Sequence, residues 1–429
     1  MSIIPEKNTG LSFLIKNKSV FRQRQYALII IFLNVVLLFL LSHYATRFFY
    51  PWLFGLLFGF VLQRSRFCFA AAFRDIFLIK NTILTRAVIV ALIVSSLGFL
   101  LLEILNPGVE LLFTFGKIQP VGLFTASGAF LFGIGMVIAG GCASGMLMRM
   151  GEGYMMQWVV MPGFLLGSAM GAWHLDWWYE LFISRAPVVF IPHLLGWPLA
   201  VLLQISLLLA LFILAGVYQN GWKGPASGWT KRINPLYLLQ SHFPKSPGTG
   251  QGLYPLLFKK PWSYVTGGVL LALLNIFYFV AWGSPWGITD GITFFAAWMI
   301  EFIGFNPDKW FYFQGATRIE GCCLPATRIN YWAFPLVYHF MAIITGALIA
   351  SLLAGEFRLR KMRSPKFVFA ALIGGLLMGY GARLSLGCNI GAFFSAIPSF
   401  SLHGWIFGVS VLAGSYLGGK ILLRFLVGW

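Results

Sequence analysis

Long apolar runs are the feature that most restricts how this chain can fold. They lie at 26–42, 87–102, 121–139, 155–172, 188–217, 263–282, 333–354, 367–382 and 402–423. A run of about 20 apolar residues is long enough for an α-helix to cross the hydrocarbon core of a bilayer. Only 10 % of the residues are charged, against roughly 25 % in soluble domains. The sequence therefore predicts an all-α polytopic membrane protein, and it lacks the alternating ~10-residue segments of a membrane β-barrel.

The distribution of charge predicts the orientation and the domain boundaries. The net charge of +19 comes largely from an N-terminal arm (1–25), a Gly/Pro/Ser-rich loop (219–261) and the segment 356–366, whereas acidic residues gather in other connections. Cytoplasmic loops of membrane proteins are enriched in Lys and Arg, so these segments and both termini are expected in the cytoplasm, and no nucleic-acid partner is needed. No small-residue cleavage site follows the first run, which predicts a retained helix. The transmembrane halves are then 26–218 and 262–429.

One motif occurs twice, at 133–145 (GIGMVIAGGCASG) and at 379–391 (GYGARLSLGCNIG). Both copies have Gly-x-Gly, five residues, Gly-Cys, two residues and Gly. With the orientation above, the first copy enters from outside and the second from inside. This pattern is typical of the inverted repeats of secondary transporters, whose sites lie at the repeat interface. Small-xxx-small patterns follow both copies, at 167–171 and 414–418, and favour close helix packing.

The cysteines lie where helices are expected to break. Glycine directly precedes Cys142 and Cys388, and non-helical backbone at membrane depth is tolerated only inside protein or beside a water-filled cavity. Half-helices starting after each cysteine would direct N–H groups toward an anion. Cys68 follows Arg64 and Arg66, and the run 52–62 before it is only half a span long. We expect a re-entrant pair of short helices there, with an ordinary inner loop as the alternative.

These residues favour an anion as the ligand. No Cys-x-x-Cys or His-x-x-x-His pair is present, so no metal or other cofactor is expected, and neither is a disulfide scaffold or a quinone-linked thiol oxidase. A copper(I) relay would be opposed by the neighbouring arginines. Each cysteine alone could be a small core residue. Arg149 and Glu152 are expected to form an ion pair after the second cysteine. Adjacent Cys322 and Cys323 are interpreted as incidental, with a role in an outer vestibule as the alternative. The candidate substrate-binding residues are Cys68, Cys142, Cys388, Arg66, Asn389, Gly141 and Gly387.

The three cysteine motifs together resemble the YeeE/YedE family of bacterial inner-membrane sulfur-compound transporters. The matching strings are RSRFCFAAAFRD (64–75), the first Gly-Cys copy followed by MGEG (150–153), and GYGARLSLGCNIGAFFSAIPSFSLHGW (379–405), which is most similar to the YedE branch. The resemblance implies an hourglass-like helical permease for thiosulfate, with cysteine thiols passing the ion along a constriction. It also implies a small cytoplasmic sulfur-carrier protein of the TusA type as partner, and for some members a link to selenium.

The sequence thus predicts a permease for thiosulfate or a related sulfur oxyanion, and not an enzyme. Weak binding at several sites permits passage where one tight site would trap the ion. No nucleotide-binding G-x-x-x-x-G-K-[ST] motif occurs. The alternatives are a membrane sulfurtransferase that passes sulfur or selenium to a cytoplasmic carrier, and a structural subunit of a selenium-handling complex.

Overall fold

A computed structural model describes residues 9–220, 254, 258, 260–314, 331–362 and 364–427. Cys322 and Cys323, and most of the loop 219–261, lie outside these described residues. Predictions about them are therefore untested.

The described chain is helical throughout and contains no strand. The helices, in chain order, are α1 (Thr9–Tyr44), α2 (Thr46–Ser65), α3 (Phe69–Leu78), α4 (Ile83–Leu105), α5 (Leu111–Phe115), α6 (Leu123–Ile138), α7 (Ala143–Gly151), α8 (Met155–Trp173), α9 (Leu175–Trp178), η1 (Tyr179–Ile183), α10 (Ile191–Leu195), α11 (Trp197–Asn220), α14 (Tyr264–Trp282), α15 (Thr289–Phe302), η3 (Pro307–Lys309), α16 (Phe311–Gln314), η5 (Tyr331–Ala333), α17 (Pro335–Ala354), α18 (Pro365–Leu384), η6 (Asn389–Ser395), α19 (Leu402–Ile421) and η7 (Leu422–Val427).

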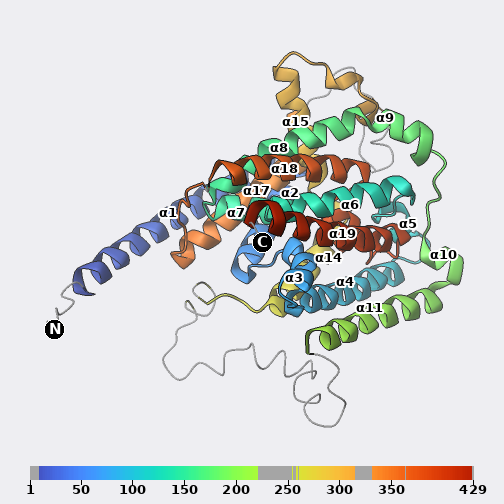
Figure 1. Ribbon diagram of the computed structural model, residues 1–429, viewed down its shortest axis with the longest axis horizontal. Helices are drawn as coiled ribbons and strands as arrows, with labels where there is room; N and C mark the ends of the chain where they lie inside the picture. Colours follow the sequence, from blue (N-terminus) through green and yellow to red (C-terminus); the bar gives the residue numbers. More distant parts are fainter. Residues whose placement is uncertain are drawn as a thin grey trace, which may run out of the picture.

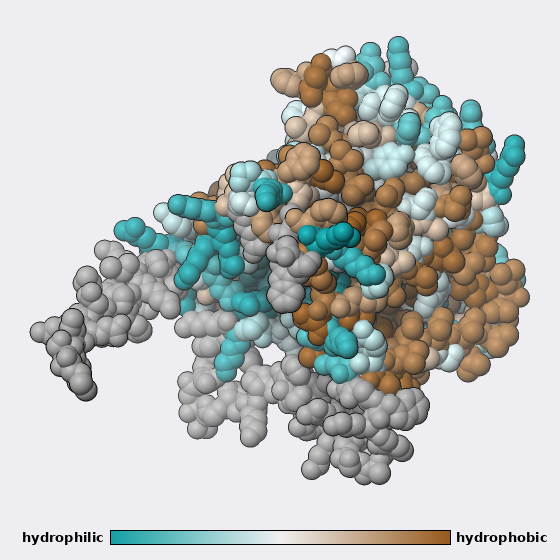
Figure 2. All heavy atoms as spheres, viewed as in Figure 1, coloured by the Kyte–Doolittle hydropathy of each residue, from teal (hydrophilic) through white to brown (hydrophobic). Residues whose placement is uncertain are grey.

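The described residues form ten helical segments that are long and apolar enough to cross a membrane, which confirms the all-α polytopic class. The long helices lie side by side, and α1 extends away from the others (Figure 1). In Figure 2 a broad field of hydrophobic side chains covers the middle of the molecule, and hydrophilic side chains gather at the end nearest α1. This distribution suits a protein with an apolar belt between two polar faces.

Glycines let α6 and α18 pack almost backbone to backbone. A methyl group added at Gly128 would stand 2.9 Å from the Gly381 carbonyl oxygen, and one at Gly135 would stand 2.7 Å from the Gly374 carbonyl oxygen. Residue numbers rise along α6 while those of their partners fall along α18, so the two helices run antiparallel. The second glycine of each Gly-x-Gly copy, Gly135 or Gly381, therefore lies in this interface, whereas the first glycines, Gly133 and Gly379, face α19 and α8.

The two helices make corresponding contacts on their other sides. The small-xxx-small segment of α8 begins with Gly167, where a methyl group would stand 2.0 Å from the Leu376 carbonyl oxygen of α18. The matching segment of α19 begins with Gly414, where a methyl group would stand 2.1 Å from the Phe130 carbonyl oxygen of α6. Close helix packing through both segments is confirmed. The pairs α8/α18 and α19/α6 thus use the same glycine positions.

Two sequence predictions about the elements need correction. The helix before Cys68 is not a half-span, because α2 has 20 residues, about 30 Å of helix. It extends beyond the apolar run through Arg47 at one end and Gln63 at the other. The run 188–217 is also divided, and its spanning helix α11 begins only at Trp197. Both errors arose because helix ends were judged from apolar residues alone. Helix α15, which follows a break at 283–288, was not predicted.

Candidate functional site

Three helix breaks share one local design, and each ends on a cysteine. Cys68, Cys142 and Cys388 are the last residues before α3, α7 and η6, and all three have extended backbone. The residue two positions earlier is left-handed in every case, with φ of 50° at Arg66, 77° at Gly140 and 54° at Leu386. A left-handed residue ends a helix, and an extended residue then redirects the chain. All three thiols are free and buried.

The structure brings Cys68 and Cys142 together. A methyl group at Gly145 would stand 3.1 Å from the Cys68 sulfur and 3.7 Å from the Cys142 sulfur, so both thiols border this glycine. The Cys142 sulfur is also 3.4 Å from the Ser144 hydroxyl. The last glycine of the repeated motif, Gly145, therefore leaves the space that two thiols from separate helix breaks border. Gly141 lies beside it, and a methyl group added at Gly141 would stand 3.6 Å from the carbonyl carbon of Gly145.

A polar cavity of about 410 Å³ leads to the Cys68 side of this pair. Its lining contains four arginines, two glutamates and two sulfur-containing side chains, namely Arg66, Arg149, Arg358, Arg360, Glu152, Glu356, Cys68 and Met148, with Gln63, Tyr154 and Gly355. Loops from both halves form its rim, because Arg360 and Gly153 share a backbone hydrogen bond of 2.9 Å. The excess of guanidinium groups over carboxylates makes the cavity attractive to small anions.

The two glutamates of the cavity are held differently. Glu356 forms ion pairs with buried Arg64 at 3.6 Å and with exposed Arg66 at 3.4 Å. Glu152 accepts a hydrogen bond of 3.3 Å from Gln63, and burial raises the pKa of its carboxyl above the ordinary value. The predicted Arg149–Glu152 ion pair is wrong. Arg149 instead donates to the carbonyl oxygen of Gly140 and so braces the turn before Cys142.

Cys388 is the cysteine of the third break, and the neighbours of its break differ from those of Cys68 and Cys142. Asn389 is buried, donates to the Met136 sulfur at 3.3 Å, and has no partner for Oδ1 among the described residues. Gly387 is required for space, because a methyl group there would stand 2.9 Å from Ala392. Of the candidate residues, Arg66 and Cys68 line the cavity, and Cys142 and Gly141 lie behind Cys68 around Gly145. Cys388, Asn389 and Gly387 belong to the third helix break.

Sequence reasoning counted Arg383 among the arginines near the cysteines but missed its partner Asp290 and the nearby Lys117. Arg383 donates to Asp290 at 2.8 Å and to the Tyr312 hydroxyl at 2.6 Å, and the two charged side chains are buried. The break at 283–288 places Gly287 against Gly391, the η6 counterpart of Gly145, and the Lys117 ammonium is 3.9 Å from where a methyl group on Gly287 would lie. The signal available in the sequence was Asp290, an acidic residue in the first turn of a short apolar helix that follows the Gly- and Pro-containing break at 283–288.

The fold and this site define a polytopic helical membrane protein whose buried thiols sit in broken helices beneath a cationic cavity. Within the described ranges no cluster of three or more His, Cys, Asp or Glu side chains offers a metal site. The chain matches the family model described as Sulphur transport over residues 64–417. It therefore belongs to that family of sulfur-compound transporters, which confirms the resemblance predicted from the cysteine motifs.

Individual relatives agree with this assignment. The chain is 29 % identical over 393 residues to the thiosulfate transporter TsuA of Spirochaeta thermophila, which covers 86 % of this chain and 97 % of that protein. It is 28 % identical over 372 residues to TsuA of Escherichia coli, covering 84 % and 90 %. A match of 33 % identity over 164 residues to the probable transporter YedE of Escherichia coli covers 38 % of this chain and 39 % of that protein. All are named as transporters, in agreement with the predicted non-enzyme.

Proposed function

We propose that this chain is a permease for thiosulfate or a closely related sulfur oxyanion. The observation that carries the proposal is the meeting of Cys68 and Cys142 across Gly145 next to a cavity rich in arginine. Guanidinium groups attract the anion, and thiols offer weak S–H donors and polarizable contacts that suit its sulfur. The similarity to two thiosulfate transporters over most of the chain supports the same substrate class.

In this proposal the path runs between two halves that form an inverted repeat, and Cys388 marks a second binding site along it. The antiparallel α6/α18 pair and the matching α8/α18 and α19/α6 contacts support this symmetry. Near Cys388, the Asn389 amide and the Lys117 ammonium would receive the anion, and it would then pass to the Cys142–Cys68 pair and the cavity. Contacts that are individually weak let the ion leave each binding site.

The cavity side faces the cytoplasm in this proposal, and the membrane is the bacterial inner membrane. Arg66, Arg358 and Arg360 line the cavity, and the basic arm, the loop 219–261 and the segment 356–366 would share its side, as the positive-inside rule requires. Both termini would then be cytoplasmic. A small TusA-like cytoplasmic carrier protein would receive the ion at this mouth.

Uptake into proteoliposomes tests the proposed substrate class. We expect the purified chain to take up labelled thiosulfate, with unlabelled thiosulfate competing strongly, selenite and sulfite weakly, and sulfate least because it lacks the soft sulfur. Equal competition by sulfate would show that the thiols do not select the ion. No uptake above protein-free vesicles, with folded protein in the bilayer, would contradict the proposed function.

Substituting Gly145 by alanine should separate the paired thiols. The new methyl group would stand 3.1 Å from the Cys68 sulfur, and overpacking of this kind typically amounts to ~1–3 kcal/mol. We expect uptake to fall by about tenfold or more, in line with that energy, while the protein remains folded. The matched control is Gly419→Ala, whose methyl group meets only the Leu78 side chain, at 3.4 Å. Equal activity of both variants would count against a functional thiol pair.

The pH dependence of uptake should depend on Glu152. Burial raises the pKa of this carboxyl, opposed by the Gln63 hydrogen bond and by the charges of Arg149, Arg66 and Arg360, and Glu356 is the other carboxylate of the cavity. Glu152 therefore gains a proton at a higher pH than an ordinary glutamate, and acidification makes the cavity more positive. We expect Glu152→Gln to increase anion affinity about two- to tenfold near neutral pH, the scale of one screened charge. The variant should also lose much of the increase in affinity on mild acidification, and an unchanged profile would refute this role.

A further inference from the structure

Helix α11 is attached to the rest of the protein at two polar points. Near one end, buried Gln204 donates to the Ser96 hydroxyl at 2.8 Å and to the Ile397 carbonyl at 3.0 Å. Near the other, the Thr82 hydroxyl bonds the Ala215 carbonyl and the Gln219 side chain, both at 2.8 Å. Only 17 % of the spanning part of α11 is buried. The helix is therefore fixed at two heights, and a crevice lies on its bundle side between them.

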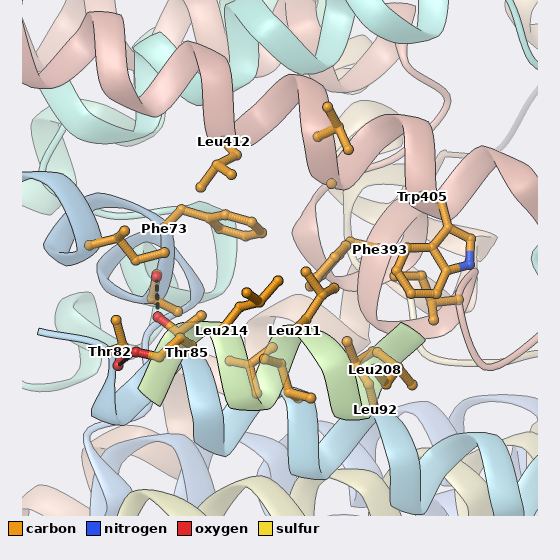
Figure 3. A pocket seen from close by; sticks show the side chains of 18 of the residues that line it. Phe73, Thr82, Thr85, Leu92, Leu208, Leu211, Leu214, Phe393, Trp405 and Leu412 are labelled. Atoms are coloured by element: carbon orange, nitrogen blue, oxygen red, sulfur yellow. Dashed lines mark hydrogen bonds between the residues drawn. The ribbon is translucent and has the colours of Figure 1, made fainter. Parts of the chain in front are cut away.

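The space between these attachments is an apolar crevice of about 330 Å³. It lies among α3, α4, α11, η6 and α19, and Leu92, Leu208, Leu211, Phe393 and Leu412 are among the side chains that line it (Figure 3). It opens sideways, because Val409 and Leu214 both line it and are more than half exposed. At this depth the surrounding medium is hydrocarbon, so a lipid chain, and not water, is the component that fills an open apolar crevice.

The length of the crevice matches one leaflet of the bilayer. Along α4 it runs from Thr82 to Leu92, which is about 15 Å of helix at 1.5 Å per residue. This is half of the ~30 Å hydrocarbon thickness of a typical bilayer. Figure 3 places Thr82 and Thr85 at one end and Leu92 and Trp405 at the other. The polar residues thus mark the headgroup end, and the apolar end lies near the bilayer midplane.

Cations surround the headgroup end. Arg86, one turn into α4, is half-buried against α11, with its guanidinium 6.0 Å from the Phe212 ring centre and with no partner for Nε among the described residues. Lys80 is exposed in the connection between α3 and α4. Lys420 is exposed on α19, next to Gly419, which faces Leu78 of α3. This arrangement complements a lipid phosphate that carries net negative charge.

We infer that this crevice binds one anionic phospholipid, with an acyl chain along α4 and the phosphate between Arg86 and Lys80. The chain would also touch the elements that carry two of the thiols. Phe73 of α3 and Phe393 of η6 both line the crevice and contact each other, with ring centres 5.3 Å apart. The lipid would therefore brace the half-helices that follow Cys68 and Cys388. The inference does not depend on the transported substrate.

Native mass spectrometry of the full chain extracted from bilayers containing equal phosphatidylglycerol and phosphatidylcholine tests the inference. We expect one retained phosphatidylglycerol per chain. Val409→Trp fills the crevice and should lower retention at least tenfold. The matched control is Val280→Trp on α14, whose valine is similarly exposed (64 % against 68 %) but lies outside the crevice, and retention should be unchanged.

The charge preference is tested with Arg86. Arg86→Gln should abolish the preference for phosphatidylglycerol over phosphatidylcholine, and Arg86→Lys should preserve it. Three results would each overturn the inference: no retained lipid in the unsubstituted protein, equal retention by the Val409→Trp and Val280→Trp variants, or equal retention of the two lipids by the unsubstituted protein. A melting measurement in detergent confirms that each variant is folded, so loss of lipid is not loss of structure.

Discussion

Replacing Cys142 or Cys388 by alanine should reduce thiosulfate uptake about 10- to 100-fold, because each variant removes a buried hydrogen bond to a charged ion, worth ~1.5–3 kcal/mol. Both thiols are buried at the starts of half-helices, so no neighbouring water can replace the lost donor. The measurement is the initial rate of uptake into proteoliposomes with equal amounts of inserted protein. Cys68→Ala should have a smaller effect, since this thiol lines the water-accessible cavity.

The matched control uses the two cysteines that we interpret as incidental. The double variant Cys322→Ala/Cys323→Ala makes the same chemical change in the same chain and should retain uptake within about twofold, the scale of a substitution outside any functional feature. If this double variant loses uptake while Cys142→Ala and Cys388→Ala retain it, the thiols of the helix breaks are structural. In that case the proposed path is wrong.

Replacing Asp290 by asparagine should destabilise the protein by ~3–5 kcal/mol, the usual result of leaving a buried charge without its partner. The Arg383 side chain is 2 % exposed and the Asp290 side chain 8 % exposed, and the pair is joined at 2.8 Å. In the asparagine variant the guanidinium keeps the Tyr312 hydroxyl but loses its ion pair with the Asp290 carboxylate. Thermal unfolding in detergent measures the change as a large fall in the melting temperature.

Two further variants separate this effect from a general loss of acidic residues. Asp176→Asn removes an exposed carboxylate and should change stability by less than ~0.5 kcal/mol. Removing both charges with Asp290→Leu/Arg383→Met should recover much of the lost stability, since apolar replacement of a buried ion pair is often neutral. If Asp290→Asn unfolds at the temperature of the unsubstituted protein, the pair is not a structural element. Its role would then be sought in the passage of the ion.

Much of the fold and of the candidate thiol site was predictable because local sequence patterns indicate both. Apolar runs are long relative to a bilayer, so the membrane-spanning class follows directly from them. The repeated Gly-Cys motif marks helix breaks, and the glycines of its first part mark close helix contacts: α6 with α18 at Gly135 and Gly381, and α6 with α19 or α18 with α8 at Gly133 and Gly379. Candidate residues such as Cys142 and Gly141 could therefore be named without coordinates, and their neighbourhood agrees with the pattern.

The remainder depends on contacts between distant segments, which local patterns do not encode. The Cys68–Cys142 contact joins breaks 74 residues apart, and nothing in either motif specifies that Gly145 would leave room for both sulfur atoms. Asp290 lies 93 residues from Arg383, so the buried pair is visible only once α15 packs against α8 and α17. The length of helix α2 was underestimated because tertiary partners stabilise its polar ends. One such contact is the ion pair of Arg64 with Glu356.

Transfer of thiosulfate labelled separately on its two sulfur atoms tests the central claim most directly. Proteoliposomes containing the purified chain are loaded from outside, and the internal sulfur species are identified by mass spectrometry. Transport of the intact ion predicts that both labels arrive together in a one-to-one ratio, and that Cys142→Ala lowers them equally. Entry of the terminal sulfur alone, with the sulfonate sulfur left outside as sulfite, would contradict the account and establish a membrane sulfurtransferase instead.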